Sequence, residues 1–329
     1  SGAFFMTGNA TLVISESQDK SDQMKLLRLI SLLNSLPVLI CSLTLAAEAV
    51  AETTHIEIPS PVINEASALT RSHRHPEVLW TLNDSGGDAA VYALNTNGEL
   101  LATLSLTGPS VINQDWEDMG SFSRGNKHYL LIADVGDNFA WRPNISLYLI
   151  EEPSLPNSPE AAQNLKAAVL HTFRVQLPNG PRDIEAIAVA PDENAAYLIS
   201  KRDNQPLLYR VSLDYMNGNR LSDQTATNLG AIRIPRADRS NHNFNWITAM
   251  DFSESGRWAY VGTLRNGYRY ARAPGQSWQE ALQQQPIVFS QPRLRQIEGG
   301  CFDWHDDRQI FVISETLPAK MGKITLPLP

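Results

Sequence analysis

The stretch DWEDMGSFSRGNKHYLLIADVGDN, residues 115–138, holds two short β-type segments separated by a polar turn. The first segment carries a glutamate, and the second is strongly apolar and ends in Asp, Gly and Asn. The same order recurs along the chain, and the first segment has four further copies: INEASAL (63–69), DIEAIAV (183–189), WITAMDF (246–252) and QIEGGCF (296–302). A repeat of roughly fifty residues built from short strands is typical of blades around an axis. The sequence therefore predicts an all-β fold, a single β-propeller.

Each copy continues with two more short alternating segments, which predicts four-stranded antiparallel blades. The last copy lacks a fourth strand, whereas HIEIPSP at residues 55–61 stands alone before the first copy. We expect this N-terminal strand to close the ring, because closure removes exposed sheet edges. The count is five blades, and a sixth would have to lie within the polar connections 213–245 or 272–295. A third such connection is 151–167, and SWQEALQQQ at 277–285 is expected to form a short outer helix.

The region before the repeats is typical of an export signal. Residues 1–23 form a polar leader, and residues 24–51 have Lys25 and Arg28 ahead of an apolar stretch and small residues before Ala51. This layout predicts a signal peptide, a propeller domain at 52–329, and a periplasmic or extracellular location. The alternative is a membrane anchor. Asn34 and Pro37 interrupt the apolar stretch, so we expect no stable anchor after cleavage.

Composition narrows the range of partners. The chain has 27 Lys and Arg against 35 Asp and Glu, a formal net charge of −8, without a long run of either sign. This argues against nucleic acid and against attraction to anionic membranes, and it leaves small molecules, cations or proteins as partners. Once the signal peptide is removed, Cys301 is the sole remaining cysteine, so no internal disulfide is expected. In the run GGCF, its thiol is expected to be buried.

The repeated glutamates are the strongest functional signal. Glu65, Glu117, Glu185 and Glu298 align in four copies, and Thr248 stands at the same point in the remaining one. Inner strands of a propeller line its channel, so these carboxylates should face one another. Like charges at close range raise one another's pKa and require compensation. A hard divalent cation, calcium above all, would supply it, and Lys or Arg partners are the alternative. A purely structural alternative is that each glutamate accepts backbone N–H bonds between blades.

The ends of the second strands bring more polar groups to the same end of the channel, which we call its mouth. In register we expect Asn83, Asp134, Lys201, Leu264 and Glu315, with Asp84, Asp137, Asn138, Arg202 and Arg265 close by. The segment DVGDN has a composition suited to calcium, although a turn whose side chains bond their own backbone explains it equally well. Lys201 and Arg265 are candidate counter-ions or clamps for an anionic group. Trp141 follows the acidic loop and is expected at the mouth. HRH at 73–75 is expected in an exposed turn without a third metal ligand.

These motifs resemble those of a known group. The repeated EA or EG of the inner strand, together with NDSGG, DWEDM, ADVGDN and LYLIEEP, resembles exported propeller proteins grouped with the esterase-like phytases. The resemblance extends more distantly to the gluconolactonase and regucalcin group, and it covers residues 60–318. It implies a channel calcium held by a first-blade glutamate, which Glu65 matches, and used to polarise a carbonyl or phosphoryl oxygen. The Asn ligands of those lactonases have no clear counterparts here, and those relatives usually have six blades.

Three hypotheses follow. The first is a calcium-dependent hydrolase of small esters, lactones or phosphoesters. The second is a non-catalytic ligand-binding or protein-interaction propeller with a structural channel ion, and the third is a glycosidase that uses a carboxylate pair. For the first, the candidate catalytic residues are Glu117, Glu185, Lys201 and Arg265. The candidate substrate-binding residues are Asn83, Asp84, Trp141, Arg202 and Glu315, and the candidate metal ligands are Glu65, Glu117, Glu185, Glu298, Asp134 and Asp137.

Overall fold

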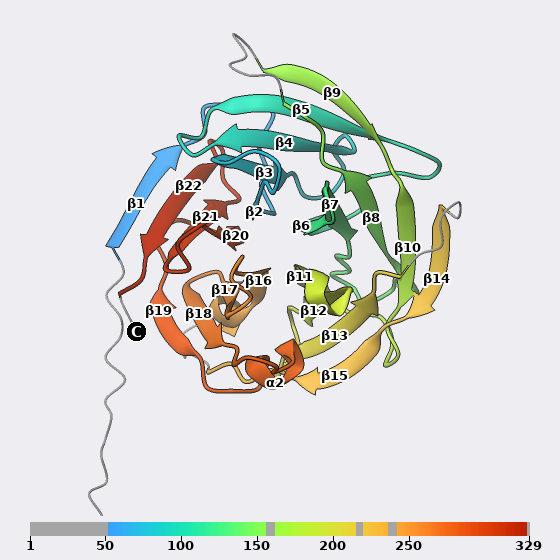
Figure 1. Ribbon diagram of the computed structural model, residues 1–329, viewed down its shortest axis with the longest axis vertical. Coiled ribbons are helices and arrows are strands. Elements are labelled where there is room, and N and C mark those ends of the chain that lie inside the picture. Colours follow the sequence, from blue (N-terminus) through green and yellow to red (C-terminus); the bar gives the residue numbers. More distant parts are fainter. Residues whose placement is uncertain (1–51, 156–161, 215–219, 236–241, 328–329) are drawn as a thin grey trace, which may run out of the picture. The chain divides into compact units, whose positions relative to one another are not determined.

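Five small β-sheets surround a central axis in the computed structural model (Figure 1). The structure describes residues 52–155, 162–214, 220–235 and 242–327, which belong to one unit of the chain, Glu48–Pro329. The expected leader (1–23) and signal peptide (24–51) lie outside the described residues. Among the described residues, no helix is both long enough and apolar enough to cross a membrane.

Every blade begins with its innermost strand. The first blade is built from β2 (Thr70–Arg71), β3 (Val78–Leu82), β4 (Ala90–Asn95), β5 (Leu100–Thr107) and β9 (Gln163–Ala168). The second blade contains β6 (Trp116–Arg124), β7 (Lys127–Asp134), β8 (Ile145–Glu151), β10 (His171–Gln176) and β14 (Leu221–Thr225).

The other three blades have four strands each. The third contains β11 (Ile184–Ala190), β12 (Ala195–Ser200), β13 (Leu207–Ser212) and β15 (Thr227–Ala231). The fourth contains β16 (Ile247–Phe252), β17 (Trp258–Thr263), β18 (Asn266–Ala271) and β19 (Ile287–Ser290). The fifth contains β20 (Ile297–Phe302), β21 (Gln309–Ser314), β22 (Lys320–Thr325) and β1 (Glu52–Glu57). The prediction of a five-bladed propeller is confirmed.

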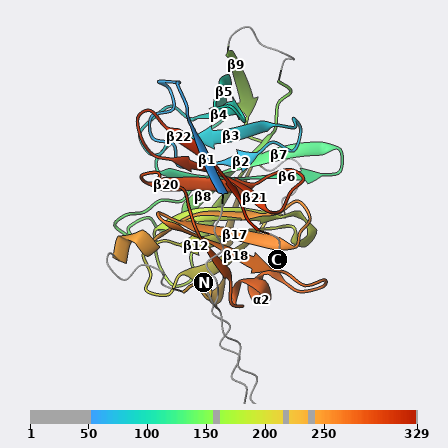
Figure 2. The same ribbon diagram turned by 90° about the vertical axis from the view of Figure 1, so that its left-hand side faces the viewer.

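Two of the predicted polar connections contain extra strands. β9 pairs in parallel with β5, and β14 pairs in parallel with β10, so the first two blades have a fifth, outermost strand. Figure 2 shows β9 beyond β5 at the edge of the first blade. In both added strands exposed and half-buried residues alternate, as expected of an edge strand with one solvated face. Because the sequences of β9 and β14 are polar, they were predicted to be connections and not strands.

The ring closes as predicted, with shifted bounds. β1 pairs antiparallel with β22, from Glu52 opposite Thr325 to Glu57 opposite Lys320. The expected strand was 55–61, but prolines at 59 and 61 have no N–H to donate, and the observed strand therefore lies earlier. At the same seam, the inner strand β20 passes close to the first blade. A Cβ on Gly299 would lie 2.5 Å from the backbone carbonyl carbon of Ala68, so a glycine is required there.

The apolar core consists of five clusters, one between each pair of neighbouring blades. Trp80 and Trp116 belong to the cluster between the first two blades, and both are fully buried. Cys301 is a free, fully buried thiol in the cluster between the fifth and first blades, as expected. The apolar residues of each blade pack against the neighbouring blades. The side chains at the axis lie outside these clusters and can therefore be polar.

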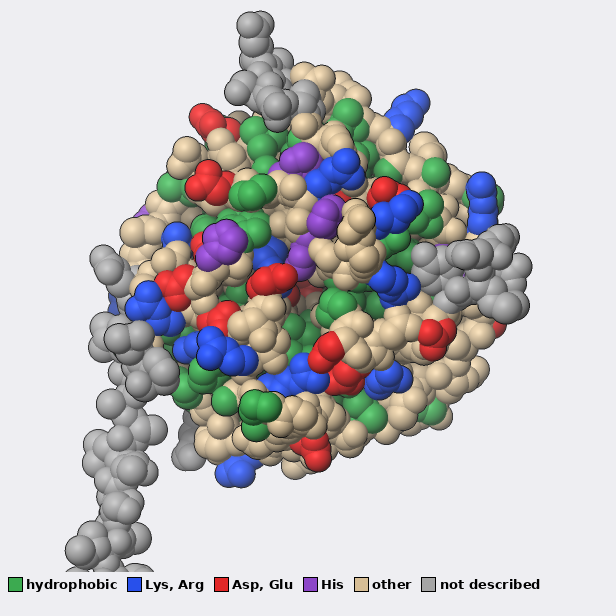
Figure 3. Space-filling view, viewed as in Figure 1, with side chains coloured by type: hydrophobic (Ala, Val, Ile, Leu, Met, Phe, Trp, Pro, Cys, Tyr) green, Lys and Arg blue, Asp and Glu red, His purple; other side chains and the backbone are tan. Residues whose placement is uncertain are grey.

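Three short helical segments complete the described part of the fold: the 3₁₀ turns Pro191–Glu193 and His242–Asn245, and the helix α2 (Trp278–Leu282). The predicted helix in SWQEALQQQ is therefore confirmed. Ser277 and Glu280 form a capping box at its start. Trp278 stacks on Phe252 with ring centroids 3.8 Å apart. On the face drawn in Figure 3, acidic, basic and histidine side chains gather near the centre.

Candidate metal and ligand site at the channel mouth

The glutamates of the repeat occupy a β-bulge at the start of the inner strands. The pairing register shifts across Glu117, Glu185 and Glu298, and also across Thr248, in the second to fifth blades. A bulge places two residues opposite one and re-aims the extra side chain. All three glutamates are buried, with 3 to 8% of their surface exposed. The repeated position is therefore the bulge position of the inner strand in these blades.

The first copy of the repeat does not follow the predicted alignment. The carbonyl of Glu65 accepts from the N–H of Asp84, the same hydrogen bond that Asp115 makes with Val135 and Asp183 makes with Lys201. Glu65 is therefore equivalent to Asp115 and Asp183, two residues before the ring. The first-blade member of the ring is Ser67. Glu65 is exposed, and its alignment with Glu117 was wrong because hydrogen-bond register, not residue type, sets the position.

The two hydroxyl residues of the ring join neighbouring blades. Ser67 Oγ donates to the carbonyl of Glu117 at 2.9 Å, and Thr248 Oγ1 donates to the carbonyl of Ile297 at 2.7 Å. Ser67 Oγ also lies within hydrogen-bond distance of Glu117 Oε2, at 3.2 Å, so Glu117 shares this role of joining blades with Ser67 and Thr248. The ring itself consists of three glutamates, one serine and one threonine.

Lys201 is the internal counter-ion of this ring. Its Nζ lies 2.7 Å from Glu185 Oε2, and its side chain is 11% exposed. Burial opposes the charged form of Lys201, but the carboxylates of Glu185, Glu298 and Glu117 outweigh it, so the pKa of Lys201 is raised. Compensation by a basic residue, the alternative to a metal, is therefore present on this side of the ring.

Burial nevertheless raises the pKa of each ring glutamate. The pKa of Glu298 is raised to about 7 by desolvation against the opposing charge of Lys201, and that of Glu185 is raised for the same reason. For Glu117 the pKa lies well above its usual range, because desolvation is reinforced by the charges of Glu185 and Asp84. One lysine does not offset three buried carboxyl groups.

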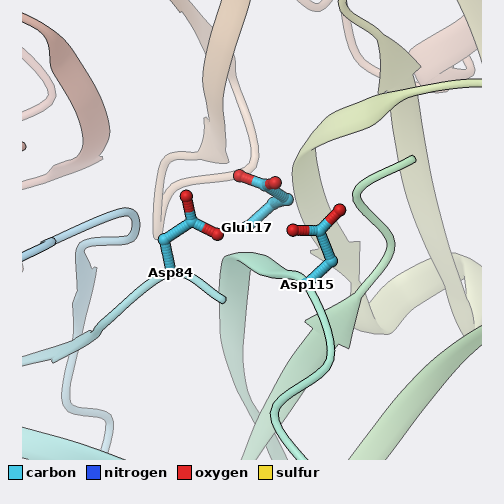
Figure 4. A group of neighbouring side chains, drawn as sticks. All are labelled: Asp84, Asp115 and Glu117. Atoms are coloured by element: carbon cyan, nitrogen blue, oxygen red, sulfur yellow. The ribbon is translucent and has the colours of Figure 1, made fainter. Parts of the chain in front are cut away.

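A second group of carboxylates adjoins Glu117. Asp84 follows β3, Asp115 precedes β6, and each offers one oxygen within 4.8 Å of the others and of Glu117 (Figure 4). Figure 4 shows the three carboxyl groups converging on a common space. Desolvation, then the Asp84 charge, raises the pKa of Asp115 to about 6, and the pKa of Asp84 is also raised by desolvation. An oxygen-only set of carboxylates suits Ca²⁺ or Mg²⁺.

Gly136 leaves room for these carboxylates. A Cβ at this position would lie 2.6 Å from Asp115 Oδ2 and would also collide with Glu117 Oε1. The DVGDN segment thus contributes its glycine to the acidic group. Its two predicted metal ligands are engaged elsewhere: Asp134 pairs with Arg142 at 2.7 Å, and Asp137 accepts the N–H groups of Trp141 and Arg142 at 2.8 and 2.7 Å. For Asp134 and Asp137 the geometry favours the turn interpretation.

The remaining predicted residues fall into two groups. Asn83 is structural, because its Oδ1 accepts the N–H groups of Asn64 and Glu65 and its Nδ2 donates to the carbonyl of Val62. Glu315 accepts from Gln296 at 2.7 Å, and desolvation raises its pKa. The other three are Arg202, Arg265 and Trp141.

Arg202 donates to Asp183 and lies over the ring of Trp246 at 4.3 Å. Arg265 is exposed and lies over Phe244 at 4.3 Å. Trp141 is 76% exposed and stacks on Phe139, itself 71% exposed, with ring centroids 4.8 Å apart.

Sequence reasoning missed Asp115, Asp183, Ser67, Gly136 and Phe139. A usable signal existed for the first two, because DWE and DIE both place an aspartate two residues before the ring glutamate. Aligning NEAS on that spacing would have matched Glu65 with Asp115 and Ser67 with Glu117. The charge of Glu185 is one cause of the raised pKa of Glu117, so these two carboxyl groups lie near each other in the ring.

Comparisons with known proteins bear on the fold alone. No family model matches the chain, and no curated protein matches it in sequence. Among solved structures, the chain is similar to the major allergen Mala s 1 of Malassezia sympodialis, with 10% identity, a TM-score of 0.50, and coverage of 82% of this chain and 95% of that one. Hydrazine synthase of Kuenenia stuttgartiensis gives 11% identity and a TM-score of 0.38 over 76% of this chain and 68% of that one. Together with the blades, the likeness to Mala s 1 defines the chain as a β-propeller.

Proposed function

We propose that the channel mouth binds calcium and that the protein is an exported hydrolase of small esters, lactones or phosphoesters. One observation carries the proposal. Asp84, Asp115 and Glu117 converge on one space without a basic partner in their hydrogen bonds or ion pairs among the described residues, whereas Lys201 is already paired with Glu185. Three carboxylates in one place need a positive guest, and oxygen ligands select a hard cation.

Glu298 supports a ligand at the same mouth. It is 8% exposed, and its Oε2 has no hydrogen-bond partner among the described residues. The charges that act on it include Lys201, Glu315 and Asp84, so it lies near the acidic group. A buried carboxylate oxygen without a partner is costly unless a ligand, a cation or water completes it. Its pKa of about 7 also suits a general base at neutral pH.

The proposed chemistry uses this division of roles. Asp84, Asp115 and Glu117 would hold the cation, and a cation bound there would polarise the carbonyl or phosphoryl oxygen of the substrate. Glu298 takes a proton from water as the water oxygen bonds to the carbonyl carbon or phosphorus. The proton then passes to the leaving alcohol oxygen as its bond to that centre breaks, which restores Glu298. Lys201 holds Glu185 in place, and Arg202 and Trp141 contact the remainder of the substrate.

Export fits the expected affinity. Extracellular calcium sites typically bind with dissociation constants of about 0.1–1 mM. Three carboxylates at an open mouth, without a dedicated loop, are consistent with that range. The signal peptide that we expect at residues 24–51 would deliver the protein to such a compartment, and N-terminal sequencing of the mature protein recovered outside the cytoplasm tests this part.

The decisive experiment separates binding from turnover. Calcium is titrated calorimetrically into the chelator-treated protein and into Asp115→Asn and Asp183→Asn, and hydrolysis of nitrophenyl esters, lactones and phosphodiesters is followed in parallel. Asp183 is the matched control, because it occupies the equivalent position in the third blade and is paired with Arg202. We expect Asp115→Asn to weaken calcium binding about tenfold or more and to abolish calcium-dependent hydrolysis. Equal effects of the two variants on calcium binding would contradict the proposed calcium site.

A non-catalytic propeller is the second candidate, and the exposed Phe139–Trp141 pair favours it, since such a surface suits a bound partner or ligand without chemistry. It predicts that chelation lowers the unfolding temperature strongly while no substrate of the three classes is turned over.

A further inference from the structure

Two exposed aromatic side chains stand on the loop next to the proposed cation site. Trp141 is 76% exposed and Phe139 is 71% exposed, and Gly136 of the same loop lies against the carboxyl groups of Asp115 and Glu117. Three residues of extended chain span at most about 11 Å, so the backbone of Phe139 lies within that distance of Gly136. One bound molecule of ordinary size can therefore reach both the cation and the aromatic pair.

Hydrogen bonds hold this loop in one conformation. The carboxylate of Asp137 accepts the N–H groups of Trp141 and Arg142 at 2.8 and 2.7 Å. The N–H of Asp137 in turn donates to Asp183 Oδ1 at 3.0 Å. Between the two aromatic residues, Ala140 has a φ of 53°, a left-handed conformation that is unfavourable for a residue with a Cβ and persists only where the surroundings enforce it. A surface fixed in advance loses little conformational entropy when a ligand binds.

The charged groups beside the aromatic pair are already engaged. Arg142 pairs with Asp134 at 2.7 Å. Arg202 donates to the carboxylate of Asp183 and to Oδ1 of Asn138, the residue before the aromatic pair. An ionic substituent would therefore find no unpaired charge of opposite sign among these side chains, whereas the two rings gain from contact with apolar surface. The surroundings of the pair favour an uncharged, apolar group.

Two aliphatic side chains are exposed on loops that are hydrogen-bonded to the segment of Asp84. Ile112 is 56% exposed, and Val62 is 44% exposed. Asn113, which follows Ile112, donates to the carbonyl of Asp84 at 2.6 Å. The carbonyl of Val62 accepts from Nδ2 of Asn83, which precedes Asp84, at 2.8 Å. Exposed apolar side chains are thus present on the loops of the first-blade ligand as well as on the loop of the aromatic pair.

We propose that the substrate of the mouth is an ester, lactone or phosphoester with a large apolar substituent, which packs on Phe139 and Trp141 while the reacting group lies at the cation. This inference rests on the proposed function, because it names the part of the substrate that does not react. Binding energy from such a remote part places the reacting group where the cation and the general base act on it. Phe139 and Trp141 are therefore residues that determine specificity, and they take no part in the chemical step.

Alkyl phosphonates test the apolar contact without turnover, because they contain no ester bond. Methylphosphonate and hexylphosphonate are titrated calorimetrically into the full chain, with calcium and with a chelator. We expect the hexyl compound to bind at least tenfold more tightly than the methyl compound, about 1.4 kcal/mol. The double variant Phe139→Ser with Trp141→Ser should lose this preference and keep its calcium affinity. Leu221→Ser is the control, because Leu221 is 50% exposed on the outermost strand of the second blade.

The outcomes separate this inference from the calcium site. Equal affinities for the two phosphonates, or a preference for hexyl that the double variant retains, would overturn the apolar contact and leave the calcium site standing. A preference for hexyl that the double variant loses, but that is the same with calcium and with chelator, would support the apolar contact and contradict the calcium site. No binding of either phosphonate would overturn both. In parallel, kcat/KM for nitrophenyl hexanoate should exceed that for nitrophenyl acetate at least tenfold, and only in proteins that keep both aromatic side chains.

Discussion

The two sides of the channel mouth solve the same electrostatic problem differently. On the third-blade side, Lys201 pairs with Glu185 and Arg202 with Asp183, so each acid has a base from its own blade. On the side of the first two blades, Asp84, Asp115 and Glu117 meet without a basic ion-pair partner within the described ranges, although the charge of Arg142 acts on Asp115. The equivalent of Lys201 is Asp84 in the first blade and Val135 in the second. One repeat therefore gives an internally neutralised sector and an acidic sector, depending on whether bases stand at the two positions of Lys201 and Arg202.

The largest effect is expected when Lys201, the base that pairs with Glu185, is removed from the third-blade side of the mouth. Lys201→Met leaves Glu185 buried without its partner, and removing one member of a buried ion pair costs about 3–5 kcal/mol. Denaturant unfolding at pH 8 measures this loss. At pH 5 the loss should be smaller, because the carboxyl groups with raised pKa are protonated there. Lys127→Met, at the exposed pair with Glu151, should cost no more than about 1 kcal/mol.

The next test fills the acidic side. Gly136→Ala places a methyl group against the carboxylates of Asp115 and Glu117, so calcium affinity should fall at least tenfold, or about 1.4 kcal/mol. Gly87→Ala is the control in a neighbouring loop, since no atom lies within 4 Å of a Cβ added there. Calcium titration of the two variants gives the answer, and an unchanged affinity for Gly136→Ala would exclude this space as the cation site.

A third test uses pH. Asp115 and Glu298 have pKa values raised from 3.8 and 4.5 to about 6 and about 7. A raised acid pKa stabilises the fold below its unfolded value, and this stability is lost as pH rises through the folded value. The chelated protein should therefore melt at a lower temperature at pH 8 than at pH 5. Calcium should restore several degrees at pH 8 and little at pH 5, because protonated carboxyl groups do not bind it. Differential scanning calorimetry with and without calcium follows both effects, and a calcium effect independent of pH would contradict them.

The smallest expected effect on stability is at the rim. Trp141→Ala removes a side chain that is 76% exposed, so the unfolding free energy should change by less than about 0.5 kcal/mol. If the mouth turns over a substrate, KM should rise several-fold at unchanged calcium affinity. An unaltered KM would restrict Trp141 to its stacking on Phe139.

The fold was predictable because the amino-acid sequence itself repeats. Short apolar segments followed by Asp, Gly or Asn turns gave the blade count, and the missing last strand indicated closure by the N-terminal segment. The added strands β9 and β14 were not predictable, since edge strands with one solvated face have polar sequences. Parallel pairing with a preceding blade leaves no local signature.

The candidate site was predictable in part, for a related reason. Glu117, Glu185, Glu298, Lys201 and Asp84 were expected at the mouth, and the structure brings them together. Glu65 was placed two positions too far along, because a bulge and a hydrogen-bond register cannot be read from one glutamate. Asp115 was overlooked because one of its partners, Asp84, comes from another blade. Which acids lack a base is a property of the assembled ring.

The pairing of β1 with β22 has a consequence for synthesis. The strand made first, Glu52–Glu57, finds its neighbour only when Lys320–Thr325 has been made. Nearly the whole chain must exist before the last sheet is complete, and contacts of such long sequence separation form slowly. Once β22 has been made and until β1 pairs with it, β22 offers an unpaired edge to any other copy nearby. Crowded nascent chains are therefore the condition in which this propeller is most exposed to exchanging strands between copies.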